Sequence, residues 1–170
     1  MAEQGPYLVA RAVTQTRPGD VMVVDAGGCV EAGFIGDILV AGFMARGGAG
    51  IVCDGAVRDL SYLRTLELPL YTRGAHASGV GRRLLGLDLN IPVRIAGVTV
   101  LPGDILMGDA EGVLAIPEAL AETVADEALA TDAKEAFLRE KLAEGVPITE
   151  AYPPSDAIQK EYQERQARSA

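Results

Sequence analysis

The apolar positions in the first half of the chain change their period from strand to helix and back. Runs of β-branched residues bounded by Gly and Pro favour buried strands, whereas apolar residues that recur every three or four positions favour helices. These patterns predict, in order, a strand at 21–25, a helix at 37–46, a strand at 50–54, a helix at 58–66 and an extended segment at 68–72. Strands that alternate with helices pair in parallel, so we expect an α/β fold built from β-α-β units.

After Gly74 the pattern changes to short apolar segments separated by turn residues. Short strands are predicted at 87–91, 93–95, 98–100, 105–107 and 113–116. The turn residues between them, such as Pro102-Gly103-Asp104, suit hairpins. A helix rich in Ala, Glu and Leu is then expected from Pro117 to Glu144, and Gly145 would stop it.

The end of the chain predicts a polar helix, at 156–168, after a bend at Tyr152-Pro153-Pro154. The apolar face of this helix consists of Ile158 and Tyr162, which is too little surface to offset the entropy of ordering the helix on its own domain. We therefore interpret residues 1–154 as a single α/β catalytic domain and residues 155–170 as a C-terminal helix that packs at a subunit interface.

The composition indicates an acidic globular protein. The 170 residues include 15 Lys+Arg and 24 Asp+Glu, which gives a net charge of −9, and 49% of them are hydrophobic. This apolar content argues against intrinsic disorder, while the negative charge and 5% aromatic residues argue against a nucleic-acid partner. Neither a long apolar run nor a secretion-signal pattern occurs, so we expect a cytoplasmic protein without a membrane partner.

Few side chains suit zinc binding or nucleophilic catalysis. Cys29 and Cys53 form no Cys-x-x-Cys pair, and His76 is the only histidine. A zinc site of the usual kind and a Ser-His-Asp or Cys-His mechanism are therefore disfavoured. Cys53 lies in a predicted strand and is interpreted as a buried core residue. The polar loop around His76 fits an exposed residue and a binding loop equally well.

Carboxylates and one arginine follow the ends of the predicted strands. Gly36-Asp37-Ile38-Leu39 opens a helix, whose free N–H groups favour a carboxylate or a phosphate. Asp54 and Arg58-Asp59 follow the next strand, and helix starts at one edge of a parallel sheet face a common crevice. This set suits a divalent cation that bridges the protein to an anionic substrate. A plainer interpretation is that Asp37 only interacts with the helix dipole and that the Arg-Asp pair is solvated.

The spacing of these residues resembles a known signature. Asp37, twenty further residues and then Arg58-Asp59 match the D-x20-R-D pattern of the class II pyruvate aldolases that cleave 4-hydroxy-4-methyl-2-oxoglutarate and 4-carboxy-4-hydroxy-2-oxoadipate. These enzymes share a fold with the bacterial ribonuclease E activity regulator. The resemblance runs from about Arg17 to about Pro154 and includes, in family order, the segments 18–25, 36–39, 50–59 and 102–105.

The resemblance implies a swivelling β/β/α-type domain that forms a homotrimer or a dimer of trimers, with each active site near a subunit interface. It implies that Asp59 holds Mg²⁺ or Mn²⁺, that Arg58 faces the keto oxygen of the substrate and that Asp37 hydrogen-bonds water on the metal. The backbone amides around Gly36, Ile38 and Leu39 would bind the pyruvyl carboxylate. The same site should decarboxylate oxaloacetate, because both reactions pass through pyruvate enolate.

The sequence leaves more than one function class open. The presence of both Asp37 and Arg58-Asp59 favours a lyase that releases pyruvate from small oxo acids. The alternative is a non-catalytic regulator that binds a protein partner, as the ribonuclease regulators do. Family members usually have helices and a strand ahead of the segment that begins at Pro18, so a shortened chain that is idle or depends on another subunit is a third interpretation.

Overall fold

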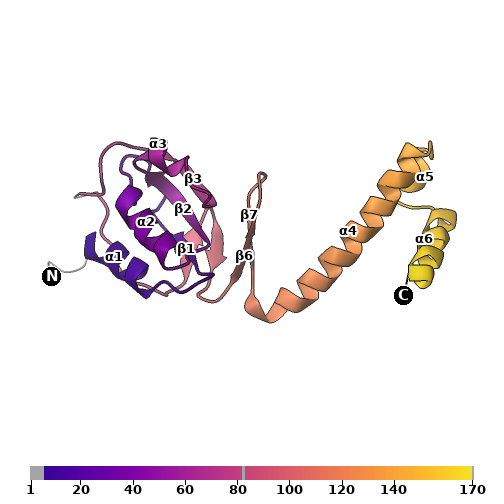
Figure 1. Ribbon diagram of the computed structural model, residues 1–170, viewed down its shortest axis with the longest axis horizontal. Coiled ribbons are helices and arrows are strands. Elements are labelled where there is room, and N and C mark those ends of the chain that lie inside the picture. The colour runs from indigo at the N-terminus through magenta and orange to yellow at the C-terminus, as the bar shows by residue number, and fades with distance from the viewer. Residues whose placement is uncertain (1–5, 82, 170) are drawn as a thin grey trace. The chain divides into compact units, whose positions relative to one another are not determined.

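A computed structural model of the chain shows two compact units, Met1–Glu118 and Ala119–Ala170. The structure describes residues 6–81 and 83–169 (Figure 1). The N-terminal stretch that was inspected for a secretion signal lies mostly outside these residues. The predicted mixed α/β architecture is confirmed.

A three-stranded parallel sheet forms the centre of the first unit. Its strands are β1 (Val21–Val24), β2 (Gly50–Val57) and β3 (Leu70–Ala75), in the order β1-β2-β3 (Figure 1). The pairs run from Val21↔Gly50 to Val24↔Cys53 between β1 and β2, and end at Val57↔Ala75 between β2 and β3. Seven of the eight β2 residues are buried, as expected for a central strand. The register of the two pairs confirms the predicted parallel pairing.

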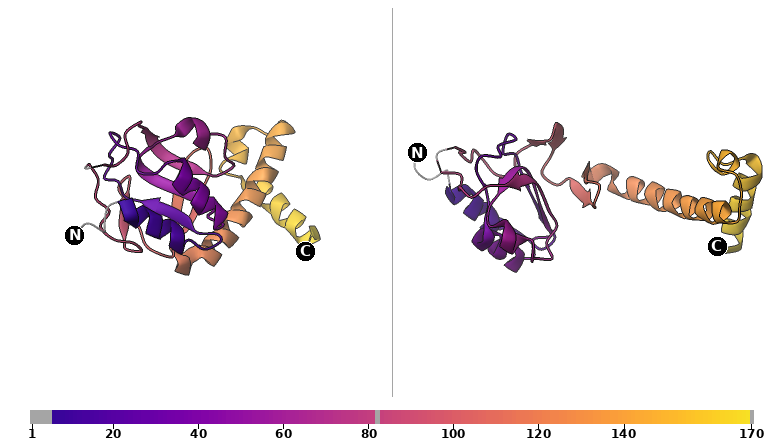
Figure 2. Two further views of the ribbon diagram at one scale, coloured as in Figure 1. Left: turned by 60° about the vertical axis from the view of Figure 1, so that its left-hand side comes forward. Right: turned by 90° about the horizontal axis from the view of Figure 1, so that it is seen from above.

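Two helices pack on one face of this sheet. α1 (Pro6–Gln15) and α2 (Asp37–Ala45) lie side by side (Figure 2). They contribute Val13, Val40 and Phe43 to the core, and Phe43 is only 1% exposed. The helix is confirmed, but the face that packs on the core carries Val40 and Phe43, whereas Ile38 of the predicted apolar spacing is 77% exposed.

Two antiparallel hairpins follow the parallel sheet. β4 (Val93–Ile95) pairs with β5 (Val98–Val100), and β6 (Ile105–Gly108) pairs with β7 (Val113–Ile116). The two residues between β4 and β5, Ala96 and Gly97, both have positive φ, which is the pattern of a type I′ hairpin turn. These four strands were all predicted from the sequence and are confirmed.

Several elements differ from the sequence predictions. Residues 87–91 form no strand, and Asn90 has a φ of 54°, which interrupts an extended chain. The short helix α3 spans Leu60–Leu63 rather than 58–66, because Asp59 has left-handed backbone and a helix cannot run through it. β2 continues to Val57, three residues beyond the predicted end. Two helices, α1 and α5 (Ile148–Ala151), were not predicted.

The second unit is helical. The long helix α4 (Ala121–Ala143) follows a single 3-10 turn, and α6 (Asp156–Ser169) lies beside the C-terminal half of α4 (Figure 1). The core of this unit consists of Phe137, Leu138 and Ile158, and the rings of Phe137 and Tyr162 are 5.3 Å apart. None of the helices in the described part of the chain combines the length and the hydrophobicity that crossing a bilayer requires.

Ion pairs surround this small core. Lys141 of α4 contacts Glu144 at 2.8 Å and Glu161 of α6 at 2.6 Å, and these hydrogen bonds raise the pKa of Lys141. Arg165 of α6 pairs with Glu140 of α4. The pairs Lys141–Glu161 and Arg165–Glu140 link α4 to α6, but at least one partner of each is solvent-exposed, so the apolar contact supplies most of the stability.

The apolar face of the C-terminal helix is covered within its own unit, and the packing of residues 155–170 at a subunit interface stays a prediction. Ile158 is 8% exposed and Tyr162 stacks on Phe137, so α4 covers the apolar face of α6 within the same unit. The chain also divides at Glu118 and not at Pro154. The physical reason is that residues 137–138 give α6 an apolar partner that its own sequence pattern does not reveal.

We predict that Phe137→Ala frees α6 from α4, because Phe137 is the largest side chain in a three-residue core. The expected loss is about 3 kcal/mol of local stability. Amide hydrogen exchange of the full chain should show lost protection in α6 and unchanged protection in β2. Leu129→Ala is the matched control, since Leu129 is on the same helix and 70% exposed. Equal effects of the two substitutions would contradict this account.

Candidate active site

Two turns meet where the strands of the parallel sheet end. One precedes α2 and the other follows β2. The Phe34 N–H donates to the Ala56 carbonyl oxygen and the Arg58 N–H donates to the Ile35 carbonyl oxygen, both at 2.9 Å. The segment before α2 therefore runs alongside the end of β2, and this arrangement brings Asp37 to Arg58-Asp59.

Gly36 is the point of closest approach between the two turns. A Cβ atom at Gly36 would overlap Oδ2 of Asp59 and would lie 2.7 Å from Nε of Arg58. Gly36 is buried and has extended backbone, with a φ of −133°. Glycine is required here because there is no room for a side chain, and not because of its backbone freedom.

Asp59 has an unusual backbone conformation. Its φ of 58° and ψ of 33° place it in the left-handed region, which Asp and Asn tolerate better than other non-glycine residues. This turn directs the carboxylate back toward α2, where Oδ2 accepts a hydrogen bond from the Asp37 N–H at 3.3 Å. The same oxygen is 3.5 Å from Nε of Arg58. Strain of this kind commonly collects at functional sites.

The first turn of α2 supplies N–H groups at the same place. The Ile38 N–H donates to Oδ1 of Asp37 at 2.7 Å, so the Asp37 side chain occupies one of the three amides implicated by the family resemblance. The amides of Gly36 and Leu39 have no hydrogen-bond partner among the residues that the structure describes. These two donors and the helix dipole favour a carboxylate at this end of α2.

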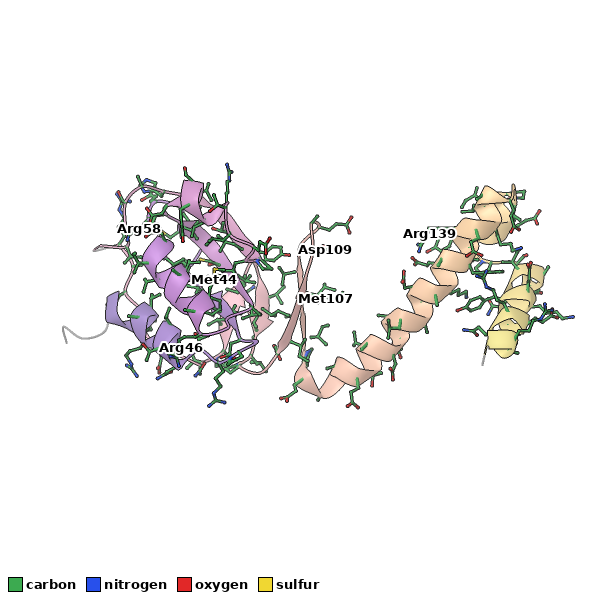
Figure 3. All side chains as sticks on the ribbon, in the orientation of Figure 1. Met44, Arg46, Arg58, Met107, Asp109 and Arg139 are labelled. Carbon is green, nitrogen blue, oxygen red and sulfur yellow. The ribbon has the colours of Figure 1, made fainter. Side chains whose placement is uncertain are left out.

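Arg58 lies between the start of α2 and a second segment. Its guanidinium approaches Gly36 on one side, and a Cβ atom at Gly79 would lie 3.9 Å from its Nη1 on the other. Figure 3 shows Arg58 at the end of α2 opposite Arg46. The side chain is 46% exposed and that of Asp59 is 39% exposed, so both are open to a ligand from solvent.

The segment 76–79 completes this arrangement, and the sequence left its role undecided. The His76 N–H donates to the Val57 carbonyl oxygen at 2.8 Å, and the Gly33 N–H donates to the Ser78 carbonyl oxygen at 2.8 Å. These bonds hold the segment against the end of β2. No local sequence signal identifies it, because the partners are more than 15 residues away along the chain.

Asp54 is not part of the arrangement, although it was predicted as one of three carboxylates in the crevice. Its side chain is buried within β2, and Oδ1 accepts a hydrogen bond from the Ala26 N–H at 2.7 Å. This hydrogen bond holds the Asp54 carboxylate inside the first unit beside Ala26, whereas Arg58 and Asp59 lie beyond the end of β2. Cys53 is buried, as predicted, and burial raises the pKa of its thiol to about 11, so it remains protonated at neutral pH.

The side chains at this site fit a divalent cation of the magnesium type. Asp37 and Asp59 each present a carboxylate at the same turn. No group of three metal-ligating side chains occurs among residues 6–81 and 83–169. Mg²⁺ commonly binds through one or two carboxylates and keeps water as its other ligands, so the carboxylate of Asp59 suffices as a protein ligand and that of Asp37 is available for another role.

The second unit has a surface hollow of about 410 Å³ between α4 and α6. Its walls carry acidic and basic side chains that pair with each other, including Lys141 with Glu161 and Arg165 with Glu140. Because these charges are already neutralised in pairs, the hollow is a weaker candidate than the turns around Gly36.

Comparison with known proteins identifies the family of this chain. The family model for RraA-like proteins, described as aldolase/RraA, matches residues 2–115. A protein of Halalkalibacterium halodurans named "Putative 4-hydroxy-4-methyl-2-oxoglutarate aldolase" is 33% identical over 144 residues, which cover 85% of this chain and 68% of the relative. A protein of the same name from Hahella chejuensis is 37% identical over 113 residues, covering 66% and 68%. The chain belongs to the RraA-like family.

Solved structures show the same fold. RraAS2 of Streptomyces coelicolor, described as an unusual member of the RNase ES inhibitor RraA family, superimposes with a TM-score of 0.75 and 34% identity over 78% of this chain and 68% of that one. An uncharacterized protein from Pseudomonas syringae pv. tomato gives a TM-score of 0.79 at 29% identity, covering 84% and 67%. The family thus includes proteins named as aldolases and proteins named as inhibitors.

We predict that Gly36→Ala displaces Asp59 and Arg58 without unfolding the first unit. The added methyl group competes with side-chain ends that can move, so the cost should be about 1–3 kcal/mol. Urea unfolding and a crystal structure of the variant would measure both effects. Gly74→Ala is the matched control, because nothing lies within 4 Å of a Cβ at Gly74. If the Asp59 carboxylate does not move in the Gly36 variant, Gly36 is not the residue that leaves space for Asp59.

Proposed function

We propose that this protein is a metal-dependent aldolase that cleaves 4-hydroxy-2-oxo diacids, such as 4-hydroxy-4-methyl-2-oxoglutarate or 4-carboxy-4-hydroxy-2-oxoadipate, to pyruvate and also decarboxylates oxaloacetate. The observation that carries the proposal is the meeting of Asp37, Arg58 and Asp59 around Gly36. The relatives named as aldolases support the same reaction class.

Arg58 is the residue that we assign to the reacting carbonyl. In an aldol cleavage the C3–C4 bond breaks, the proton leaves the C4 hydroxyl, and the electron pair of the broken bond moves toward the C2 oxygen to form an enolate. The free face of the Arg58 guanidinium donates hydrogen bonds to that oxygen as its charge develops. The unpaired amides of Gly36 and Leu39 bind the adjacent carboxylate and fix the orientation of the keto acid.

Asp59 and Asp37 have different roles in the proposed reaction. Asp59 would hold Mg²⁺ or Mn²⁺ through its carboxylate. The bound cation supplies Lewis-acid stabilisation of the developing negative charge. Asp37 is the carboxylate that accepts the proton from the C4 hydroxyl, since its Oδ1 is held in place by the Ile38 N–H. The first unit has no lysine among its described residues, so a Schiff-base mechanism has no nucleophile there.

A non-catalytic regulator is the second candidate, because RraAS2 has a similar fold and is described as belonging to an inhibitor family. A regulator needs a binding surface but no arrangement of Arg58, Asp59 and Asp37 around one glycine. The same assays separate the two functions, because a regulator releases no pyruvate.

We predict that the protein releases pyruvate from oxaloacetate with Mg²⁺, that EDTA abolishes the release and that added Mg²⁺ restores it. A coupled lactate dehydrogenase assay measures the rate. Because Mg²⁺ alone accelerates this decarboxylation, Arg58→Ala at the same Mg²⁺ concentration is the blank. Asp59→Asn should lose the metal-dependent rate while keeping the left-handed backbone, which Asn tolerates. Full activity after complete removal of metal would exclude the mechanism.

We predict that Arg58→Lys is nearly as damaging as Arg58→Ala. A planar guanidinium can donate to the enolate oxygen while its Nε stays beside Asp59, whereas an ammonium group cannot reproduce this geometry. The expected loss is a factor on the order of 100 in turnover. Steady-state kinetics with oxaloacetate would measure it. A lysine variant with a rate close to that of the wild type would make the role of Arg58 structural.

A further inference from the structure

The segment after β3 leaves the sheet beside Arg58. Val57 and Ala75 are register partners in the parallel pair β2–β3, so the next residue of each strand, Arg58 and His76, leaves the sheet at the same edge. The His76 N–H continues the ladder by donating to the Val57 carbonyl oxygen. Neighbouring strands are separated by about 4.8 Å, so the two residues start from adjacent positions.

The segment 76–79 is held in place beside the Arg58 side chain. Gly33, in the turn before α2, forms a parallel β-bridge with Gly79, and its N–H donates to the Ser78 carbonyl oxygen. Nη1 of Arg58 lies close to Gly79, whereas its Nε lies close to Gly36. A ligand that contacts the guanidinium and the start of α2 therefore has residues 76–79 on its other side.

The local hydrogen bond of His76 indicates which tautomer the neutral ring adopts. The Ser78 N–H donates to Nδ1 of His76 at 3.1 Å, and a nitrogen that accepts a hydrogen bond carries no proton. The neutral ring therefore carries its proton on Nε2, which acts as a donor. Nε2 has no hydrogen-bond partner in the part of the chain that the structure describes, and the ring is only partly buried.

We infer that Nε2–H of His76 binds the second carboxylate of the diacid, the one attached to C4. This inference rests on the aldolase function proposed above. The first carboxylate has the amides of Gly36 and Leu39, and Arg58 is assigned to the C2 oxygen, so the second carboxylate needs a donor of its own. Arg83, the next described cation along the chain, already pairs with Glu31.

The test compares a diacid with its methyl analogue. The substrates are 4-hydroxy-4-methyl-2-oxoglutarate and 4-hydroxy-4-methyl-2-oxopentanoate, in which a methyl group replaces the second carboxylate. His76→Ala should raise the KM for the diacid about tenfold or more, which is the value of one hydrogen bond to a charged group. The kcat for the diacid and both constants for the methyl analogue should stay unchanged.

Two conservative variants identify the nitrogen involved. The amide nitrogen of glutamine can occupy the place of Nε2, whereas that of asparagine occupies the place of Nδ1. His76→Gln should therefore retain most of the preference for the diacid, and His76→Asn should lose it as His76→Ala does. A role in holding the segment alone would not distinguish Gln from Asn in this way.

Three outcomes would overturn the inference. The first is a preference for the diacid that survives in His76→Ala. The second is an equal loss for both substrates, which would mean that His76 positions Arg58 and binds no carboxylate. The third is a wild-type protein that releases no pyruvate from either substrate with Mg²⁺, which would refute the proposed function itself. The first two outcomes are compatible with the aldolase function, whereas the third is not. Failure of the inference about His76 can therefore be distinguished from failure of the proposed function.

Discussion

The absence of a side chain at Gly36 is the constraint on which the site depends. The turn before α2 and the turn after β2 approach so closely that one methyl group would fill the space between them. Their backbones are already joined by the hydrogen bonds of Phe34 and Arg58, so neither turn can withdraw without breaking the edge of the sheet. The cost of misplacing Asp59 is thereby linked to the stability of the fold itself.

Much of the first unit could be predicted from local sequence patterns. The three parallel strands consist of β-branched and apolar runs bounded by turn residues, the extent of α2 follows from its apolar period although Ile38 is exposed, and the hairpins carry their turn residues at the turns. The predictions failed where a non-local contact decides the outcome. Residues 87–91 have apolar residues at alternate positions but pair with no strand. Residues 55–57, which are Gly, Ala and Val, extend β2 because Ala56 and Val57 pair with β3.

The candidate site likewise contains some features that local sequence patterns predict and others that depend on non-local contacts. The spacing of Asp37 and Arg58-Asp59 could be found in the sequence, because each follows a predicted strand. The exclusion of Asp54 could not, since it depends on the direction of one side chain toward the Ala26 amide. The position of residues 76–79 beside Arg58 depends on hydrogen bonds to Val57 and Gly33. The pattern of apolar residues in the sequence does not indicate these hydrogen bonds. In the second unit, α6 similarly finds its apolar partner in α4, through Phe137.

The left-handed backbone at Asp59 also bears on how such a protein can change over evolutionary time. Asparagine and glycine fit the same φ and ψ, whereas glutamate, which keeps the charge, is strained there. A single Asp-to-Asn exchange would therefore remove the negative charge and preserve the fold. For the proposed aldolase, loss of catalysis is then a short mutational step from an intact scaffold, whereas the reverse step would restore the site only if Gly36 has been retained. A fold of this kind can be shared by enzymes and by binding proteins without large structural change.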